Sequence, residues 1–296
     1  MEGAGMRLGR VLGVNIYLNP FFLGLLALYF VAGVLDRGLV AFGVVLVHEM
    51  AHALMANRLG ISSNEVELLP FGGVARAGTE LQVDPLRETY TALAGPASNL
   101  AMFALGVALK NYGLWHADLG PFFLQCNLLM AFFNMLPALP LDGGRVYRSY
   151  LAARIGITPA TYRVALLGQI FGVLIAVFGV LGIWWGACGL DIPVTAFFLF
   201  YAATRERSAA PYLLMQLLMR KQQELFREGV LSAKQLVVTE NVPLGQLIRF
   251  FMPRCYHLMT VLDRHWQYKG TVTETRVIDT LLHRGANVPV GELIEK

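Results

Sequence analysis

Charged side chains are scarce in this chain. Asp, Glu, Lys and Arg make up 15% of its 296 residues, whereas a soluble globular domain carries about 25%. Hydrophobic residues make up 56%, and they gather in long runs that contain few or no charges. This composition excludes an ordinary soluble domain and predicts a polytopic α-helical membrane protein.

Cysteine is rare as well. The three cysteines are Cys126, Cys188 and Cys255, and no C-x-x-C pair occurs. The sequence therefore indicates neither a disulfide framework nor a thiolate zinc site. We interpret Cys126 and Cys188, which lie in apolar segments, as small buried hydrophobic residues.

A strong excess of one charge is also missing. The net charge is +4, and the basic residues lie at the ends of apolar segments and in the C-terminal part, which suits membrane orientation rather than nucleic-acid binding. A cleavable signal peptide is not indicated either. Arg7 and Arg10 precede an uncharged run from Val11 to Leu35, which is long for the apolar region of a signal peptide and is not followed by a small-residue cleavage pattern. We expect a retained first helix.

The apolar runs predict six membrane spans. With the N-terminus inside, the inner membrane-proximal loops hold nine arginines, and the outer loops hold only Arg37 and Lys110. Because positive residues favour the cytoplasmic side, we predict that both termini are cytoplasmic. The predicted spans are 15–35, 38–57, 89–109 and 119–141, with two more inside 164–204 that turn near Trp184.

The second predicted span contains His48-Glu49-Met50-Ala51-His52, an H-E-x-x-H pattern. Positions i and i+4 share one face of a helix, so both imidazoles can reach one metal ion. Glu49 then lies beside that ion, where it can take a proton from water. Two core histidines bonded to backbone carbonyls are the less favoured alternative, because ionisable groups are costly at membrane depth.

We expect a third ligand at the end of the fourth predicted span, where prolines and glycines interrupt the helix. Asp142 is the only carboxylate between Asp118 and Asp191, and a catalytic zinc ion held by two histidines needs a third protein ligand. Asp142 is therefore the leading candidate, with a helix cap as the alternative. Asn134 is our candidate donor to a reaction oxyanion, with ordinary interhelical hydrogen bonding as an equal alternative.

A β-hairpin is predicted between the second and third spans. Alternating residues at Glu65–Leu68 and Val74–Ala77 flank a Gly-rich turn, although an ordinary surface loop is also compatible with them. An exposed strand edge there could pair with an extended peptide. In the third span, we interpret Ala94-Gly95-Pro96 as a helix-packing segment, and support of the metal site is the second interpretation of Asn99.

The chain becomes more polar from Arg205 onward. We divide it into a membrane metalloprotease domain at 1–204, an amphipathic linker helix at 205–230 and a small α+β domain at 231–296. The last domain has the element order β-α-β-β-α, with its first helix at Pro243–Phe251. It is so small that pairing with a second copy into a homo-oligomer is plausible.

Several of these motifs together resemble the site-2 protease family of intramembrane zinc metalloproteases, over roughly residues 10–205. The resemblance implies cleavage of a substrate within or near the membrane. It also implies one zinc ion held by His48, His52 and Asp142, with Glu49 as the base. The motifs are His48-Glu49-x-x-His52, Leu69-Pro70-Phe71-Gly72-Gly73, Ala94-Gly95-Pro96 and the segment from Asn134 to Gly144.

Within that family the sequence is most similar to the sporulation branch, on its size, its six predicted spans, the hairpin sequence and the C-terminal tail. This likeness implies a multi-pass protein of a bacterial membrane, on the mother-cell side. The implied substrate is a membrane-associated protein, the precursor of a sporulation sigma factor, and the implied partners include inhibitory membrane proteins. Another membrane-anchored regulator is the alternative substrate.

The tail at 231–296 resembles a single CBS domain, a module that binds adenine nucleotides in the family. Modules that bind ATP often carry an Asp three residues after the Thr of a Gly-x-x-Thr strand. Gly270 and Thr273 match that strand, but Arg276 takes the place of the Asp and counts against ATP here. The tail would then bind substrate or pair subunits.

Two other classes of function compete with proteolysis. A zinc transporter or sensor would use the same ligands and would not need Glu49, but the sequence shows no second polar cluster and no internal repeat. A regulatory scaffold that acts through the C-terminal domain would tolerate Asp142→Asn.

Overall fold

The computed structural model describes residues 6–61, 65–69, 72–75, 84–113, 115–187, 189–251 and 255–294. The chain forms two compact units. The first comprises the chain up to Ser149 together with Val164–Glu206, and the second comprises Tyr150–Arg163 and the chain from Arg207 onward. Three helices pass from one unit to the other: α5 (Asp142–Ile155), α6 (Ile157–Trp184) and α7 (Asp191–Glu228).

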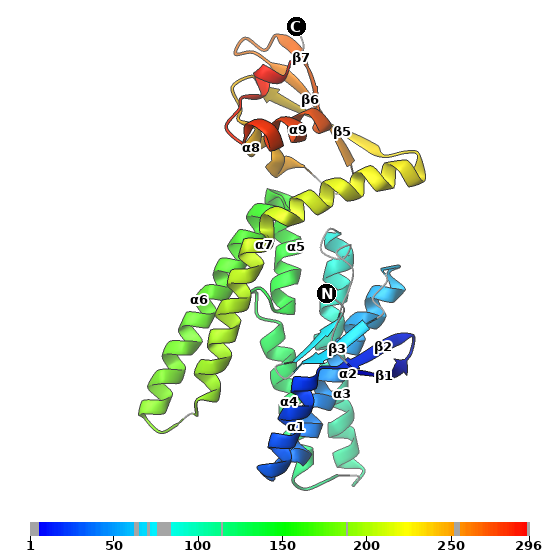
Figure 1. Ribbon diagram of the computed structural model, residues 1–296, viewed down its shortest axis with the longest axis vertical. Helices are drawn as coiled ribbons and strands as arrows, with labels where there is room; N and C mark the ends of the chain where they lie inside the picture. The colour runs from blue at the N-terminus through cyan, green and yellow to red at the C-terminus, as the bar shows by residue number, and fades with distance from the viewer. Residues whose placement is uncertain are drawn as a thin grey trace. The chain divides into compact units, whose positions relative to one another are not determined.

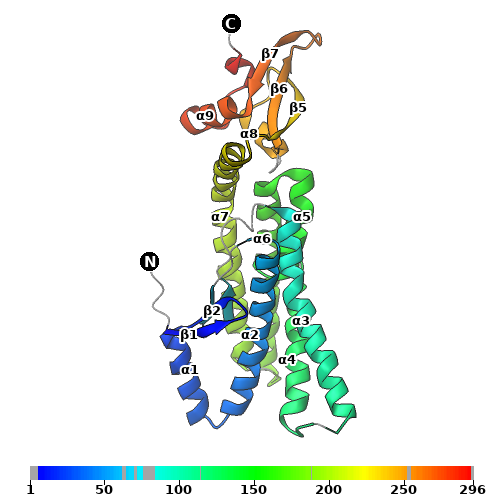
Figure 2. The same cartoon turned by 90° about the vertical axis from the view of Figure 1, so that its right-hand side faces the viewer.

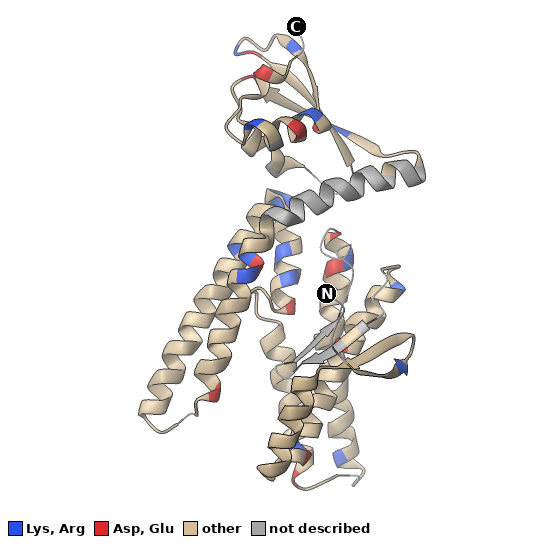
Figure 3. Ribbon diagram, viewed as in Figure 1, with Lys and Arg blue, Asp and Glu red and all other residues tan. Residues whose placement is uncertain are grey.

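The first unit is built mainly from apolar helices. α2, α3 and α4 run side by side and contact one another, and long stretches of α2, α4 and α6 carry no charged side chain (Figures 1 and 3). Within the described chain, α2, α3 and α6 are long and apolar enough to cross a membrane, whereas α1 and α4 are shorter apolar helices. The expected helical membrane protein is confirmed, and the number of six spans stays a prediction. The helices not yet given bounds are α1 (Pro20–Val31), α2 (Leu35–Arg58), α3 (Pro85–Asn111) and α4 (Leu119–Asn134).

A four-stranded sheet lies against one face of α2 (Figure 2). Its order is β1-β2-β3-β4, with β2 and β3 parallel and the two outer pairs antiparallel. The predicted hairpin is present as β3 and β4, although Arg76 and Ala77 lie outside the described residues. The strands are β1 (Met6–Val11), β2 (Val14–Leu18), β3 (Glu65–Leu69) and β4 (Gly72–Ala75).

The prediction of a first span at 15–35 was wrong in its first residues. Val14–Leu18 is a strand whose Val14 and Ile16 pack against α2, so the apolar side chains alternate instead of following a helical period. The helix begins only at Pro20, where the Asn19 side chain accepts a hydrogen bond from the Phe21 N–H. With 12 residues, α1 is about 18 Å long, which is shorter than the ~30 Å hydrocarbon core.

The fourth predicted span is interrupted after Asn134, as its prolines and glycines suggest. Residues 135–141 form an irregular loop whose Ala138 and Leu139 are buried. This loop packs closely on α5, because a Cβ at Gly143 or Gly144 would overlap backbone atoms of Met135 or Ala138. The two glycines therefore allow α5 to begin directly behind the loop, with Asp142 as its first residue.

A buried ion pair ties α5 to α3. The Arg148 guanidinium contacts the Glu88 carboxylate, and the Ser149 hydroxyl donates to the same carboxylate at 2.9 Å. Arg148 and Glu88 are each 2% exposed, and Glu206 on α7 lies 3.9 Å from Arg148. This pair fixes α5 less than two turns after Asp142.

The second unit contains a three-stranded sheet in the order β5-β6-β7. β5 (Ser232–Thr239) and β6 (Cys255–Leu262) are parallel, and β7 (Tyr268–Thr273) is antiparallel to β6. The predicted order β-α-β-β-α is confirmed. The helix expected at Pro243–Phe251 was too long: α8 covers only Leu244–Leu247, and a 3-10 turn follows it. α9 (Glu274–Arg284) completes a core built around Leu244, Met259 and Val272.

Replacing Arg148 by Leu would leave the Glu88 carboxylate buried without its cation. Removing one partner of a buried ion pair costs about 3–5 kcal/mol, so we expect Arg148→Leu to lower the unfolding temperature of the detergent-solubilised protein markedly. Circular dichroism during heating measures this change. Arg154→Leu on the exposed end of α5 is the control, and equal unfolding temperatures for the two variants would contradict the role given to the pair.

Candidate metal centre

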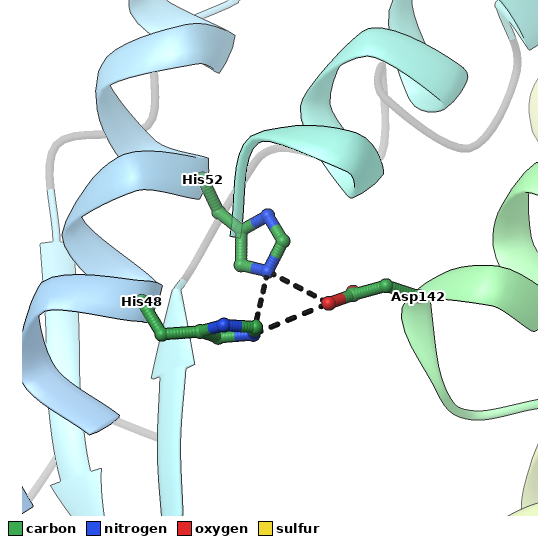
Figure 4. Close-up of side chains that lie close together, drawn as sticks. All are labelled: His48, His52 and Asp142. Carbon is green, nitrogen blue, oxygen red and sulfur yellow. Dashed lines mark hydrogen bonds and ion pairs between the residues drawn. The ribbon is translucent and has the colours of Figure 1, made fainter. Parts of the chain in front are cut away.

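Three ligand atoms converge between α2 and α5 (Figure 4). His48 Nε2 and His52 Nε2 are 3.1 Å apart, and Asp142 Oδ2 lies 3.2 Å from the first and 3.1 Å from the second. All three residues are buried. The structure thus brings together the two histidines of the H-E-x-x-H pattern and a carboxylate that lies 90 residues later in the chain.

The other ring nitrogen of each histidine is held from behind by α3. His52 Nδ1 lies 2.7 Å from the Thr91 carbonyl oxygen, which can only accept a hydrogen bond, so Nδ1 carries the proton. His48 Nδ1 lies 2.6 Å from Asn99 Oδ1 and donates to it in the same way. Both Nε2 atoms of the neutral rings therefore present lone pairs to each other and to Asp142.

This arrangement fits a zinc ion. Three lone pairs at 3.1–3.2 Å repel one another unless a cation lies between them. A tetrahedral zinc ion with ligands at about 2.0–2.2 Å places those ligands about 3.3–3.6 Å apart, slightly wider than the observed spacing. Two imidazoles and one carboxylate are also a ligand set that catalytic zinc sites use.

Gly95 forms one wall of the site. A Cβ at this position would overlap His52 Nε2 and would lie 2.6 Å from His48 Cε1. The sequence suggested only helix packing for Ala94-Gly95-Pro96, because nothing local shows which residues face the histidines. The glycine is needed so that the α3 backbone can approach the ligand rings.

The two residues predicted to take part in catalysis lie on different helices: Glu49 is on α2 with the histidine ligands, and Asn134 is the last residue of α4. Glu49 is half-buried, and its carboxyl interacts electrostatically with the ligands His48, His52 and Asp142 and with Arg145. Asn134 ends α4, where its Nδ2 donates to the Met130 carbonyl at 3.1 Å. Since an amide NH₂ has a second hydrogen, the role of Asn134 as an oxyanion donor stays a prediction. Sequence reasoning missed that the charge of Arg145 acts on Glu49.

The fold and the metal centre define a class: a helical membrane protein with an H-E-x-x-H zinc site completed by an aspartate from another helix. Residues 38–117 match peptidase family M50. The solved structure of the site-2 protease from Methanocaldococcus jannaschii shares the fold, with a TM-score of 0.54 and 23% identity, over 69% of this chain and 95% of that chain. The membrane part of this chain is therefore similar in fold to a site-2 protease, and its H-E-x-x-H segment lies within the residues that match peptidase family M50.

Two relatives show how far the likeness extends. The chain is 28% identical to Rip3 of Mycobacterium tuberculosis, described as a zinc metalloprotease, over 271 residues that cover 84% of this chain. It spans 64% of the length of Rip3. It is 31% identical to stage IV sporulation protein FB of Bacillus subtilis over 134 residues, which cover 45% of this chain and 46% of that protein. The resemblance to the family is confirmed, whereas the likeness to the sporulation branch is partial.

Replacing Gly95 by Ala should disrupt zinc binding, because the new methyl group overlaps the ligand rings. We expect at least a tenfold loss of zinc affinity, measured by competition with a chromophoric chelator on the purified protein. Gly43→Ala is the matched control, since it lies on α2 with no neighbouring atom within 4 Å of its added Cβ. Unchanged zinc affinity in Gly95→Ala would show that α3 does not approach the ligands as described.

Proposed function

We propose that this chain is an intramembrane zinc endopeptidase that cleaves a membrane-associated protein. The observation that carries the proposal is the set of three buried ligands, with a glutamate directly after the first of them in the H-E-x-x-H segment. Three protein ligands leave one coordination position open, which is typical of catalytic zinc sites and not of structural ones.

The residues of the site divide the chemistry among themselves. When bound, zinc supplies the Lewis acid that makes water a nucleophile near neutral pH. His48, His52 and Asp142 hold the ion. Glu49 takes the proton from the attacking water and later passes it to the leaving amine. Asn134 remains our candidate donor to the oxyanion.

The sheet beside α2 supports a polypeptide as the substrate. β4 is the last strand in the sheet order, and it contacts the helix that carries His48 and His52. An extended peptide can add to such an edge through backbone hydrogen bonds. These bonds keep the peptide extended around the scissile bond, and they form whatever the side chains of the peptide are.

A membrane-bound sigma-factor precursor is the first substrate to test. The partial likeness to stage IV sporulation protein FB supports it, and another membrane-anchored regulator is the second choice. The distribution of arginines supports cytoplasmic termini, and so a cytoplasmic entry to the site. The β-α-β-β-α order of the second unit supports a single CBS-like module that pairs subunits or binds substrate.

Zinc transport is less well supported by the same site. A transport path usually repeats its polar sites in two halves of the molecule. Among the described residues, His48, His52 and Asp142 form the one cluster with metal-binding geometry, and all its members lie in the first unit.

Replacing Glu49 by Gln should abolish cleavage while zinc stays bound, because the amide keeps the shape of the side chain but cannot accept the proton. General-base catalysis typically contributes about 10²–10⁴-fold, so we expect turnover to fall by that factor. The measurement is the size of a co-expressed sigma-factor precursor on a gel, together with the zinc content of the purified variant.

Asp36→Asn is the control, because it removes a carboxylate from the exposed first turn of the same helix. A chelator should stop cleavage by the wild type, and added zinc should restore it. Cleavage by Glu49→Gln at the wild-type rate would contradict the assignment of Glu49 as the general base.

A further inference from the structure

Asn127 lies at the far end of a hydrogen-bond chain that begins at the zinc ligand His48. His48 Nδ1 lies 2.6 Å from Asn99 Oδ1, and Asn99 Nδ2 lies 3.0 Å from Asn127 Oδ1. Asn127 Nδ2 in turn lies 2.9 Å from the carbonyl oxygen of Phe123. The chain crosses α2, α3 and α4, and both asparagine side chains are 0% exposed.

The Phe123 carbonyl determines the direction of every bond in this chain. A carbonyl oxygen can only accept, so the group of Asn127 that faces it must be the NH₂. The Asn127 oxygen therefore faces Asn99 and accepts from its NH₂, and the Asn99 oxygen faces His48. Reversing the chain would place the oxygens of Asn127 and Phe123 2.9 Å apart, with no hydrogen between them.

We propose that Asn127 is a positioning residue for zinc, which acts by fixing the orientation of the Asn99 amide. With its oxygen toward His48, Asn99 requires a proton on Nδ1 and leaves the Nε2 lone pair for the metal. Without Asn127, the buried Asn99 amide loses the acceptor for its NH₂ and is free to rotate by half a turn. The NH₂ would then face His48 Nδ1 and favour the tautomer whose Nε2 carries a proton and cannot bind zinc.

His52 needs no such device. Its Nδ1 faces the Thr91 backbone carbonyl, which can only accept a hydrogen bond. An amide side chain can present either its oxygen or its NH₂, so His48 depends on a second residue that determines which of the two faces it. The proposal rests on the zinc site and not on the identity of the substrate, so a failure to find proteolysis would leave it standing.

The first measurement is the zinc affinity of Asn127→Leu, which keeps the approximate size of the side chain and removes its polarity. Groups that hydrogen-bond directly to metal ligands typically contribute about 10–100-fold to affinity, and Asn127 acts through such a group, so we expect a loss of about tenfold. Chelator competition on the purified, detergent-solubilised full chain gives the affinity. Binding of Co²⁺ adds a visible spectrum that reports the ligand set of the folded protein.

Gln169→Leu is the matched control. It also removes a hydrogen bond between two helices, which Gln169 Nε2 on α6 donates to Thr204 Oγ1 on α7 at 2.9 Å. Zinc affinity and the Co²⁺ spectrum should match those of the wild type in this variant. Wild-type zinc affinity in Asn127→Leu would overturn the proposal.

Asn99→Asp separates positioning from a general effect on folding. A carboxylate accepts at both oxygens, so it holds the proton on His48 Nδ1 in any orientation and no longer needs Asn127. The second oxygen of that carboxylate would face Asn127 Oδ1 at the 3.0 Å now spanned by a hydrogen bond, and two acceptors repel, so we expect Asn99→Asp alone to lose some zinc affinity. Adding Asn127→Leu removes this repulsion and should raise the affinity of Asn99→Asp or leave it unchanged. If Asn127→Leu weakens zinc binding equally in both backgrounds, its role is structural and the proposal fails.

Discussion

The ligand atoms of His48, His52 and Asp142 face one another between α2 and α5, and the packing of the first unit holds them in place. Two neutral imidazole nitrogens and a carboxylate oxygen repel at 3.1–3.2 Å, and the apolar surroundings weaken this repulsion very little. A cation relieves it, but only if each ligand is held in place beforehand. The carbonyl behind His52 and the amide behind His48 supply that support.

The packing of α2 follows from the same requirement. One face of this helix contacts the sheet through Met50 and Ala53, and the other presents His48 and His52 to α3. α3 can approach closely only because Gly95 has no side chain. The third ligand reaches the site from α5, which the tight loop at 135–141 and the Arg148–Glu88 pair hold in position.

The comparisons and the structure supply different parts of the conclusion. The M50 match ends at residue 117, so it includes two of the metal ligands and not Asp142. The structure joins that aspartate to the histidines and explains why a zinc ion fits them. Neither determines the substrate, because a hydrolytic zinc site acts on the peptide group that all polypeptides share.

The amino-acid sequence by itself determined the membrane class, the approximate positions of α2, α3 and α6, the metal-binding pair and the choice of Asp142. These follow from composition and from spacing along one helix, which are local properties. Only the tertiary structure decided that 14–18 is a strand, that Gly95 forms a wall of the site and that Asn127 stands behind Asn99. Each of these depends on a partner far away in the chain. Hydropathy measures the free energy of transferring a segment from water to lipid. It contains no information about which distant backbone or side chain that segment will contact.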